Sequence, residues 1–143
     1  MAVRLACQVQ LPFTLGGLEG CAVYLNCGEG DFPIKRLSEI ASNYSIKYSV
    51  SAEELLDGVF IENVSNVEQL EMVLKFHLPS LIPTKNVRLV IIDSIAGLFR
   101  SEYGEPHLIT SRSNDLFRMS SIMKRLSSQN SIPFVCINQV KKF

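Results

Sequence analysis

A short, almost entirely apolar run that ends in one carboxylate constrains the fold of this chain more than any other feature. The run is Val87-Arg88-Leu89-Val90-Ile91-Ile92, and Asp93-Ser94 follows it directly. Such a run is typical of a strand buried on both faces of a parallel sheet. Because the carboxyl ends of parallel strands line the ligand crevice of open α/β sheets, we expect Asp93 to hold the magnesium of a nucleotide through a water molecule. The run therefore predicts one half of a nucleoside triphosphate site.

The other half of such a site is a phosphate loop, Gly-x-x-x-x-Gly-Lys-Ser/Thr, and the sequence does not contain this motif. No lysine follows a glycine, and none precedes a serine or threonine. The pattern indicates part of an ATPase core without the loop that cradles the phosphates. We therefore expect ATP and magnesium to belong to a more complete protein and neither to be bound by this chain alone.

Segments that predict strands alternate with segments that predict helices. The predicted strands cover residues 21–26, 59–64, 87–94 and 134–138. A helical pattern covers residues 2–10, another begins at Pro33, and a long one follows residue 110 with a stripe of Leu116, Met119, Met123 and Leu126. This alternation predicts an α/β fold in which helices flank a mainly parallel sheet.

Capping and helix-breaking residues predict where the other helices begin and end. Ser51 and Ser65 each start a capping-box pattern. Gly58 is expected to end the first of these helices, and Pro79 with Pro83 to end the second. The helix after Pro33 is expected to bury one face, made of Ile34, Leu37, Ile40, Ala41 and Tyr44. An irregular stretch is expected at residues 101–110, which contain a glycine and a proline.

Composition limits the class of protein more than its partners. The chain has 143 residues, with 14 basic residues against 14 acidic ones, so any contact with nucleic acid has to be local. Four cysteines without a Cys-x-x-Cys pair fit a reducing compartment such as cytosol or nucleus. No apolar run approaches the roughly 20 residues of a membrane helix, so a membrane partner is not expected. A helix is open at the N-terminus and a strand ends near the C-terminus, so residues 1–143 are expected to be a partial domain truncated at both ends.

Two further polar segments follow predicted strands. Glu29 lies after the strand at 21–26, where a carboxylate could polarise the water that attacks a γ-phosphate. Asn138 and Gln139 follow the last strand, where an amide could bond to phosphate. Each residue alone is more often a solvated loop residue, and Asp93 alone is more often the cap of a turn. Three polar strand ends at one sheet edge favour the functional interpretation.

The residues named so far resemble the RecA-like recombinase family. The resemblance runs in order through Cys27–Leu37, Phe60–Val67, Arg88–Tyr103 and Cys136–Val140. It covers nearly the whole chain and is most specific among the eukaryotic DNA-repair paralogues of the family.

The resemblance implies roles for individual positions. Glu29 matches the catalytic glutamate, Asp93 with Ser94 matches the Walker B position, and Gln139 matches the catalytic-site glutamine that opens the second DNA-facing loop. Residues 100–112 match the first such loop, so Arg100 and Arg112 are expected to contact DNA phosphates. The chain carries one residue more than the family pattern between Tyr24 and Glu29, which puts the position of Glu29 in question.

The resemblance also implies a function, with two alternatives open. The leading hypothesis is a nuclear repair protein of homologous recombination at double-strand breaks, which binds single-stranded DNA in an ATP-dependent way and pairs with another recombinase paralogue. The family is a DNA-dependent ATPase, whereas the absent phosphate loop leaves enzymatic activity of this chain open. The alternatives are a non-catalytic interaction module that cannot bind ATP, and another RecA-like ATPase such as a hexameric helicase core.

Overall fold

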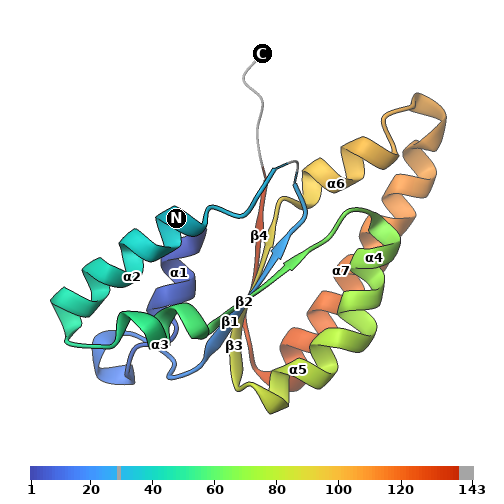
Figure 1. Ribbon diagram of the computed structural model, residues 1–143. Coiled ribbons are helices and arrows are strands. Elements are labelled where there is room, and N and C mark those ends of the chain that lie inside the picture. The colour runs from blue at the N-terminus through green and yellow to red at the C-terminus, as the bar shows by residue number, and fades with distance from the viewer. Residues whose placement is uncertain (29, 139–143) are drawn as a thin grey trace.

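Four parallel strands form one sheet in the computed structural model, which describes residues 1–28 and 30–138. The strands are β1 (Cys21–Asn26), β2 (Val59–Asn63), β3 (Val87–Asp93) and β4 (Phe134–Ile137), and their order across the sheet is β2-β1-β3-β4. The predicted α/β fold with a parallel sheet is confirmed. All four strands point their carboxyl ends to the same edge (Figure 1).

Helices cover both faces of this sheet (Figure 1). One face packs against α1 (Ala2–Gln8), α2 (Ile34–Tyr48) and α3 (Ala52–Asp57). The other face packs against α4 (Val67–Met72), the π-helical turn η2 (Val73–His77), α5 (Leu78–Thr84) and α7 (Ile109–Asn130). The helix α6 (Ile95–Glu102) lies beyond the carboxyl edge, and two short 3₁₀ turns, η1 (Phe13–Leu15) and η3 (Pro106–Leu108), complete the described structure.

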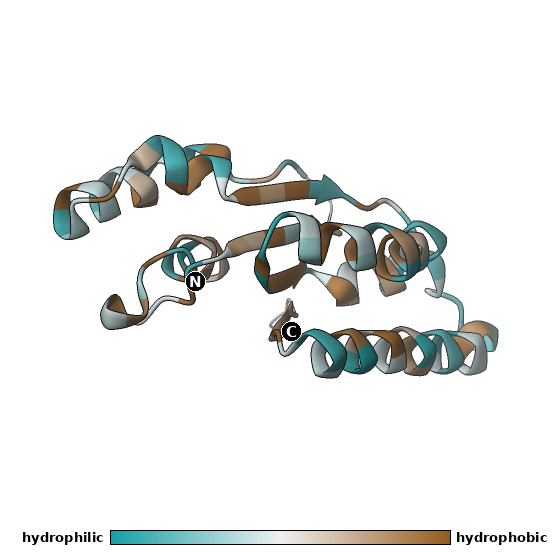
Figure 2. Cartoon of the chain, turned by 90° about the horizontal axis from the view of Figure 1, so that it is seen from below, coloured by the Kyte–Doolittle hydropathy of each residue, from teal (hydrophilic) through white to brown (hydrophobic). Residues whose placement is uncertain are grey.

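The central strands are buried and the outer strand β4 is not. Val90, Ile91 and Ile92 of β3 are fully buried, because helices cover both faces of the strand. In Figure 2 the strands are mainly brown, whereas the helices show both teal and brown faces. Cys136 of β4 is exposed, because β4 pairs only with β3 among the described residues.

The prediction that Pro79 and Pro83 end a helix is wrong. The helical segment continues through η2 into α5, which contains both prolines. In η2 the amide of Leu78 bonds to the carbonyl of Val73, one residue further back than in an α-helix. The wider turn makes room for the pyrrolidine ring of Pro79, which an α-helix would not accommodate without a clash.

The expected irregular stretch at residues 101–110 is also mostly helical. α6 extends to Glu102, η3 covers residues 106–108, and α7 begins at Ile109. Only residues 103–105 connect α6 to η3. Gly104 lies in this connection, and Pro106 is the first residue of η3. A proline at the start of a helical turn loses no hydrogen bond, so its presence does not require a loop.

Two smaller expectations need correction. The cap of α4 is Asn66, whose side chain accepts a hydrogen bond from the amide of Gln69 at 2.7 Å, and not Ser65. Ile34, the first residue of α2, is 57% exposed, although the rest of the predicted face of the helix is buried. Across the described residues, no helix combines the length and apolar character that crossing a bilayer requires.

Candidate functional site

A row of residues in register ends the strands at the carboxyl edge of the sheet. Asn63, Asn26, Asp93 and Ile137 lie next to one another across β2, β1, β3 and β4. Side chains of register partners point to the same face of a parallel sheet. Asp93 therefore occupies the predicted position at a strand end, with an amide side chain beside it.

The carboxylate of Asp93 is held by a tyrosine from the neighbouring strand. The hydroxyl of Tyr24 donates a hydrogen bond to Oδ2 of Asp93 at 2.5 Å, and Tyr24 is only 2% exposed. Burial, followed by this hydrogen bond, raises the pKa of Tyr24 well above its ordinary value. The proton therefore stays on Tyr24, which acts as the donor, and the bond is a charge-assisted one.

Ser94 has a local structural role. Its side chain is buried and accepts a hydrogen bond from the amide of Gly97 at 3.2 Å, which caps the N-terminus of α6. This hydrogen bond explains why a serine follows the strand directly, and the explanation requires no ligand. The nucleotide-binding role that the sequence implied for Ser94 stays a prediction.

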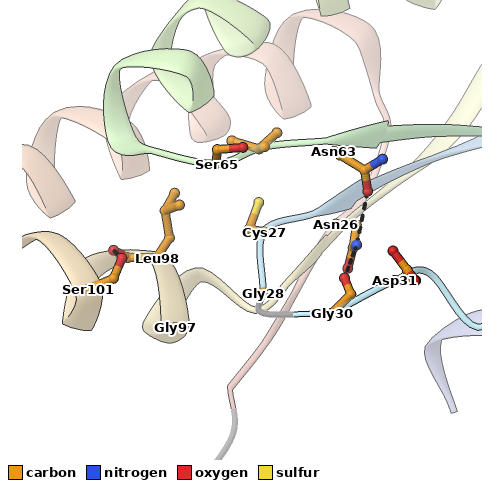
Figure 3. Close-up of a pocket in the computed structure, with 11 residues that line it drawn as sticks. Asn26, Cys27, Gly28, Gly30, Asp31, Asn63, Ser65, Gly97, Leu98 and Ser101 are labelled. Atoms are coloured by element: carbon orange, nitrogen blue, oxygen red, sulfur yellow. Dashed lines mark hydrogen bonds between the residues drawn. The ribbon is translucent and has the colours of Figure 1, made fainter.

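Two cavities open at the carboxyl edge, on different sides of β1. A cavity of about 290 Å³ is lined by Tyr24 and Asp93 together with the first residues of α1 and Ile137. A second cavity of about 320 Å³ lies between the ends of β1 and β2 and the helix α6 (Figure 3). Asp93 lines only the first of them.

Two asparagines that the sequence analysis did not single out shape the second cavity. Nδ2 of Asn26 donates hydrogen bonds of 3.0 Å to Oδ1 of Asn63 and to the carbonyl of Gly30 (Figure 3). Both asparagines are the last residues of their strands. The criterion that selected Asp93, a polar residue ending a strand, would have found them as well.

Cys27 follows Asn26, lines the same cavity and is buried. Burial, with smaller contributions from Asp93 and Cys136, raises the pKa of its thiol from 9.0 to about 12. A thiol with so high a pKa is not a nucleophile at neutral pH. Cys27 therefore contributes packing and not chemistry to this edge.

The remaining predicted residues do not come together in one place. Glu29 and Gln139 lie outside the described residues. Arg100 is an exposed residue of α6, and Arg112 is a partly buried residue near the start of α7. Neither arginine lines the cavity at Asp93 or the cavity between β1 and β2.

Polar contacts fix the helices that carry these arginines. Oε1 of Glu102 accepts a hydrogen bond of 2.5 Å from the amide of Val67, at the start of α4. The hydroxyl of Tyr103 donates to Asp115, which also pairs with Arg118 at 2.8 Å. Arg118 in turn pairs with Glu71 of α4 at 2.9 Å. The α6–α7 region is therefore tied to α4 by hydrogen bonds and ion pairs.

The donor set at the strand end fits the metal side of a magnesium–nucleotide complex. Mg²⁺ keeps most of its waters and usually takes only one or two carboxylates from a protein. In the described ranges, no group of three or more His, Cys, Asp or Glu side chains could hold a metal by itself. Asp93, partly exposed at the cavity of about 290 Å³, suits contact through a metal-bound water.

Comparisons with known proteins agree with the family resemblance. A family model described as Rad51 matches residues 1–142. "DNA repair protein XRCC3" of Mus musculus is 36% identical over 148 residues, which cover 98% of this chain and 41% of that protein. The "DNA repair protein XRCC3 homolog" of Arabidopsis thaliana is 33% identical, with coverage of 98% and 48%. "DNA repair protein RAD51 homolog 2" of Mus musculus is 35% identical, with coverage of 96% and 40%. The chain thus spans less than half the length of these relatives.

Proposed function

The chain belongs to the Rad51 family, and from this premise we propose that it is part of the ATPase core of a nuclear DNA repair protein of homologous recombination, acting at double-strand breaks. The relatives at 33–36% identity carry names of DNA repair proteins, two of them XRCC3. The observation that carries the proposal within the structure is Asp93, which ends the buried strand β3 at the edge where α/β sheets bind nucleotides.

The proposed roles at this edge follow the family pattern. Asp93 would hold the water shell of magnesium, and Ser94 next to it would belong to the same nucleotide-binding position, while its side chain also caps α6. Glu29 acts as the base toward the attacking water, and Gln139 as the amide at the neighbouring strand end. ATP, when bound, supplies the phosphoryl group whose loss changes the conformation of the core.

The chain of 143 residues by itself is proposed to bind no ATP. A phosphate loop supplies a nest of backbone amides and a lysine for the β- and γ-phosphates, and the motif for it is absent from this sequence. This observation also favours the second candidate function for the chain on its own, a non-catalytic module that competes for partner surfaces. The presence of a phosphate loop in a longer form of the protein distinguishes the two functions.

The proposed partners are single-stranded DNA and a second recombinase paralogue. Arg100 and Arg112 would contact phosphates, which provides affinity without base readout. Because the net charge of the chain is zero, DNA binding should be weak. Because the proposed contacts are to phosphates, binding should also weaken as the salt concentration rises.

Nucleotide binding by a form of the protein that carries a phosphate loop tests this function. Asp93→Asn should weaken magnesium-dependent binding of a fluorescent ATP analogue, because it removes the charge next to the metal. Glu29→Gln should leave binding intact and slow hydrolysis by about 10²-fold or more, because a base acts only in the chemical step.

The 143-residue chain is the reference sample in the same titration and should show no magnesium-dependent affinity in the micromolar range. Such an affinity in the reference sample would refute the proposed dependence on the phosphate loop. Loss of binding in a folded Glu29→Gln variant would refute the role assigned to Glu29. Salt-insensitive binding of a labelled oligonucleotide would refute the assigned DNA contacts.

A further inference from the structure

We infer that Tyr24 is a positioning residue, whose hydroxyl fixes the rotamer of Asp93 so that the second carboxylate oxygen stays directed at the cavity of about 290 Å³ that both residues line. The inference rests on the proposed function, in which Asp93 serves the magnesium–nucleotide complex, and adds a residue that the family resemblance did not assign. It begins from the geometry of β1 and β3.

The register of the two strands allows this contact. Tyr24 pairs with Ile91, so Asp93 stands two residues further along β3 on the same face of the sheet. A long side chain reaches such a diagonal neighbour. The Tyr24 hydroxyl therefore approaches Asp93 from the amino-terminal side of β3. It donates its hydrogen bond to Oδ2 of Asp93.

The tyrosine is itself held in place. Its ring meets the ring of Phe32 edge to face, with centroids 4.7 Å apart and an angle of 79° between the planes. Phe32 precedes α2, and Tyr24 is buried among residues of the α1–α2 core. A ring fixed by packing on the sheet and by an aromatic neighbour can orient a hydrogen-bonded partner.

The side chain of Asp93 needs such an anchor because it stands at a strand end beside a cavity. An aspartate χ1 has three staggered positions, and nothing in an open cavity selects one of them. A charge-assisted hydrogen bond of 2.5 Å selects the position in which Oδ2 faces Tyr24. Packing alone does not explain the hydroxyl, because phenylalanine would fill the same space.

The alternative is that Asp93 merely satisfies a buried hydroxyl, as buried polar groups require. The two cases differ in which side chain depends on the other. If Tyr24 positions Asp93, loss of the hydroxyl frees the carboxylate. If Asp93 only satisfies Tyr24, loss of the hydroxyl leaves the rotamer of Asp93 unchanged.

The test is the χ1 distribution of Asp93, measured by NMR from the three-bond couplings of its carboxyl carbon in the 143-residue chain and in Tyr24→Phe. We expect one dominant rotamer in the original chain and a population of that rotamer lower by roughly a factor of two in Tyr24→Phe. No nucleotide is present, so this result stands whether or not the proposed ATP-dependent function holds.

Tyr44→Phe is the matched control. Tyr44 is 7% exposed, lies in the same core, and donates a hydrogen bond of 2.9 Å to Oε1 of Gln8. Both variants should lose a similar amount of thermal stability, and Tyr44→Phe should leave the Asp93 couplings unchanged. An unchanged Asp93 rotamer in Tyr24→Phe, or an equal change in both variants, would overturn the inference. If Tyr24→Phe does not fold, the couplings in Phe32→Leu provide the test, since a loosened Tyr24 ring should also broaden the Asp93 distribution.

Discussion

The strand end at Asp93 and the α6–α7 region are close in sequence but differ in how much ion pairing adds to burial. Asp93 follows three fully buried residues of β3 and bonds to a tyrosine that is 2% exposed. Phe99 and Met119 also anchor α6 and α7 in the core, but polar contacts add to this burial. The bonds of Glu102 and Tyr103 are partly buried, and the ion pair of Arg118 with Glu71 is exposed. Burial supplies stability that salt hardly affects, whereas surface ion pairs contribute little and are screened. Salt should therefore weaken the exposed ion pair of Arg118 in the α6–α7 region more than the contacts at the strand end.

Two raised pKa values show the same contrast. The pKa of Cys27 at the strand end and the pKa of Tyr103 in the α6–α7 region both rise to about 12. For Cys27 the main cause is burial, and for Tyr103 it is the hydrogen bond to Asp115. A buried environment persists as long as the fold does, whereas a hydrogen bond depends on one partner side chain.

The largest expected difference between the two regions is in stability. Ile91 in β3 is fully buried and Ile109 at the start of α7 is 61% exposed. Ile91→Ala should lower the free energy of unfolding by about 2–5 kcal/mol, because it leaves a cavity in the sheet core. The same substitution at Ile109 should change it by less than about 0.5 kcal/mol. Denaturant titration measures both, and equal losses would contradict the contrast between the regions.

An intermediate effect is expected from pH at the strand end. Because the folded chain raises the pKa of Cys27, the unfolded chain releases the thiol proton first as pH rises. The contribution of the protonated Cys27 thiol to the free energy of unfolding is fully present below about pH 9. It should fall by roughly 2 kcal/mol by about pH 10.5. Urea titrations at several pH values should show this slope in the original chain and a shallower slope in Cys27→Ala. Identical slopes would show that the thiol does not titrate on unfolding.

The smallest effect is expected where Glu102 caps α4. Glu102→Ala should cost about 1 kcal/mol and should speed hydrogen exchange at the amide of Val67, because that amide loses its acceptor. Glu102→Gln keeps an acceptor oxygen and should restore most of the protection. Glu105→Ala, at an exposed position in the connection that follows α6, is the control and should leave exchange at Val67 unchanged. Fast exchange at Val67 in Glu105→Ala would show that the effect does not depend on the carboxylate of Glu102.

The sequence by itself determined the elements whose signals are local. The strand predicted at residues 21–26 has the observed bounds, and β3 ends at Asp93, since a β-branched apolar run between turn residues has few other structures. Ser51 caps α3 as its capping-box spacing predicted. The parallel sheet followed from the alternation of predicted strands and helices, and the family resemblance from residues that keep their order along nearly the whole chain.

Tertiary structure alone decided the features that depend on register and packing. Pro79 and Pro83 break an isolated helix, but packing of α5 against β3 and a π-helical turn keep the segment helical. The bond from Tyr24 to Asp93 and the bond from Asn26 to Asn63 join residues 69 and 37 positions apart, so no local pattern encodes them. They arise because parallel pairing brings the strand ends to one edge and sets the register between them.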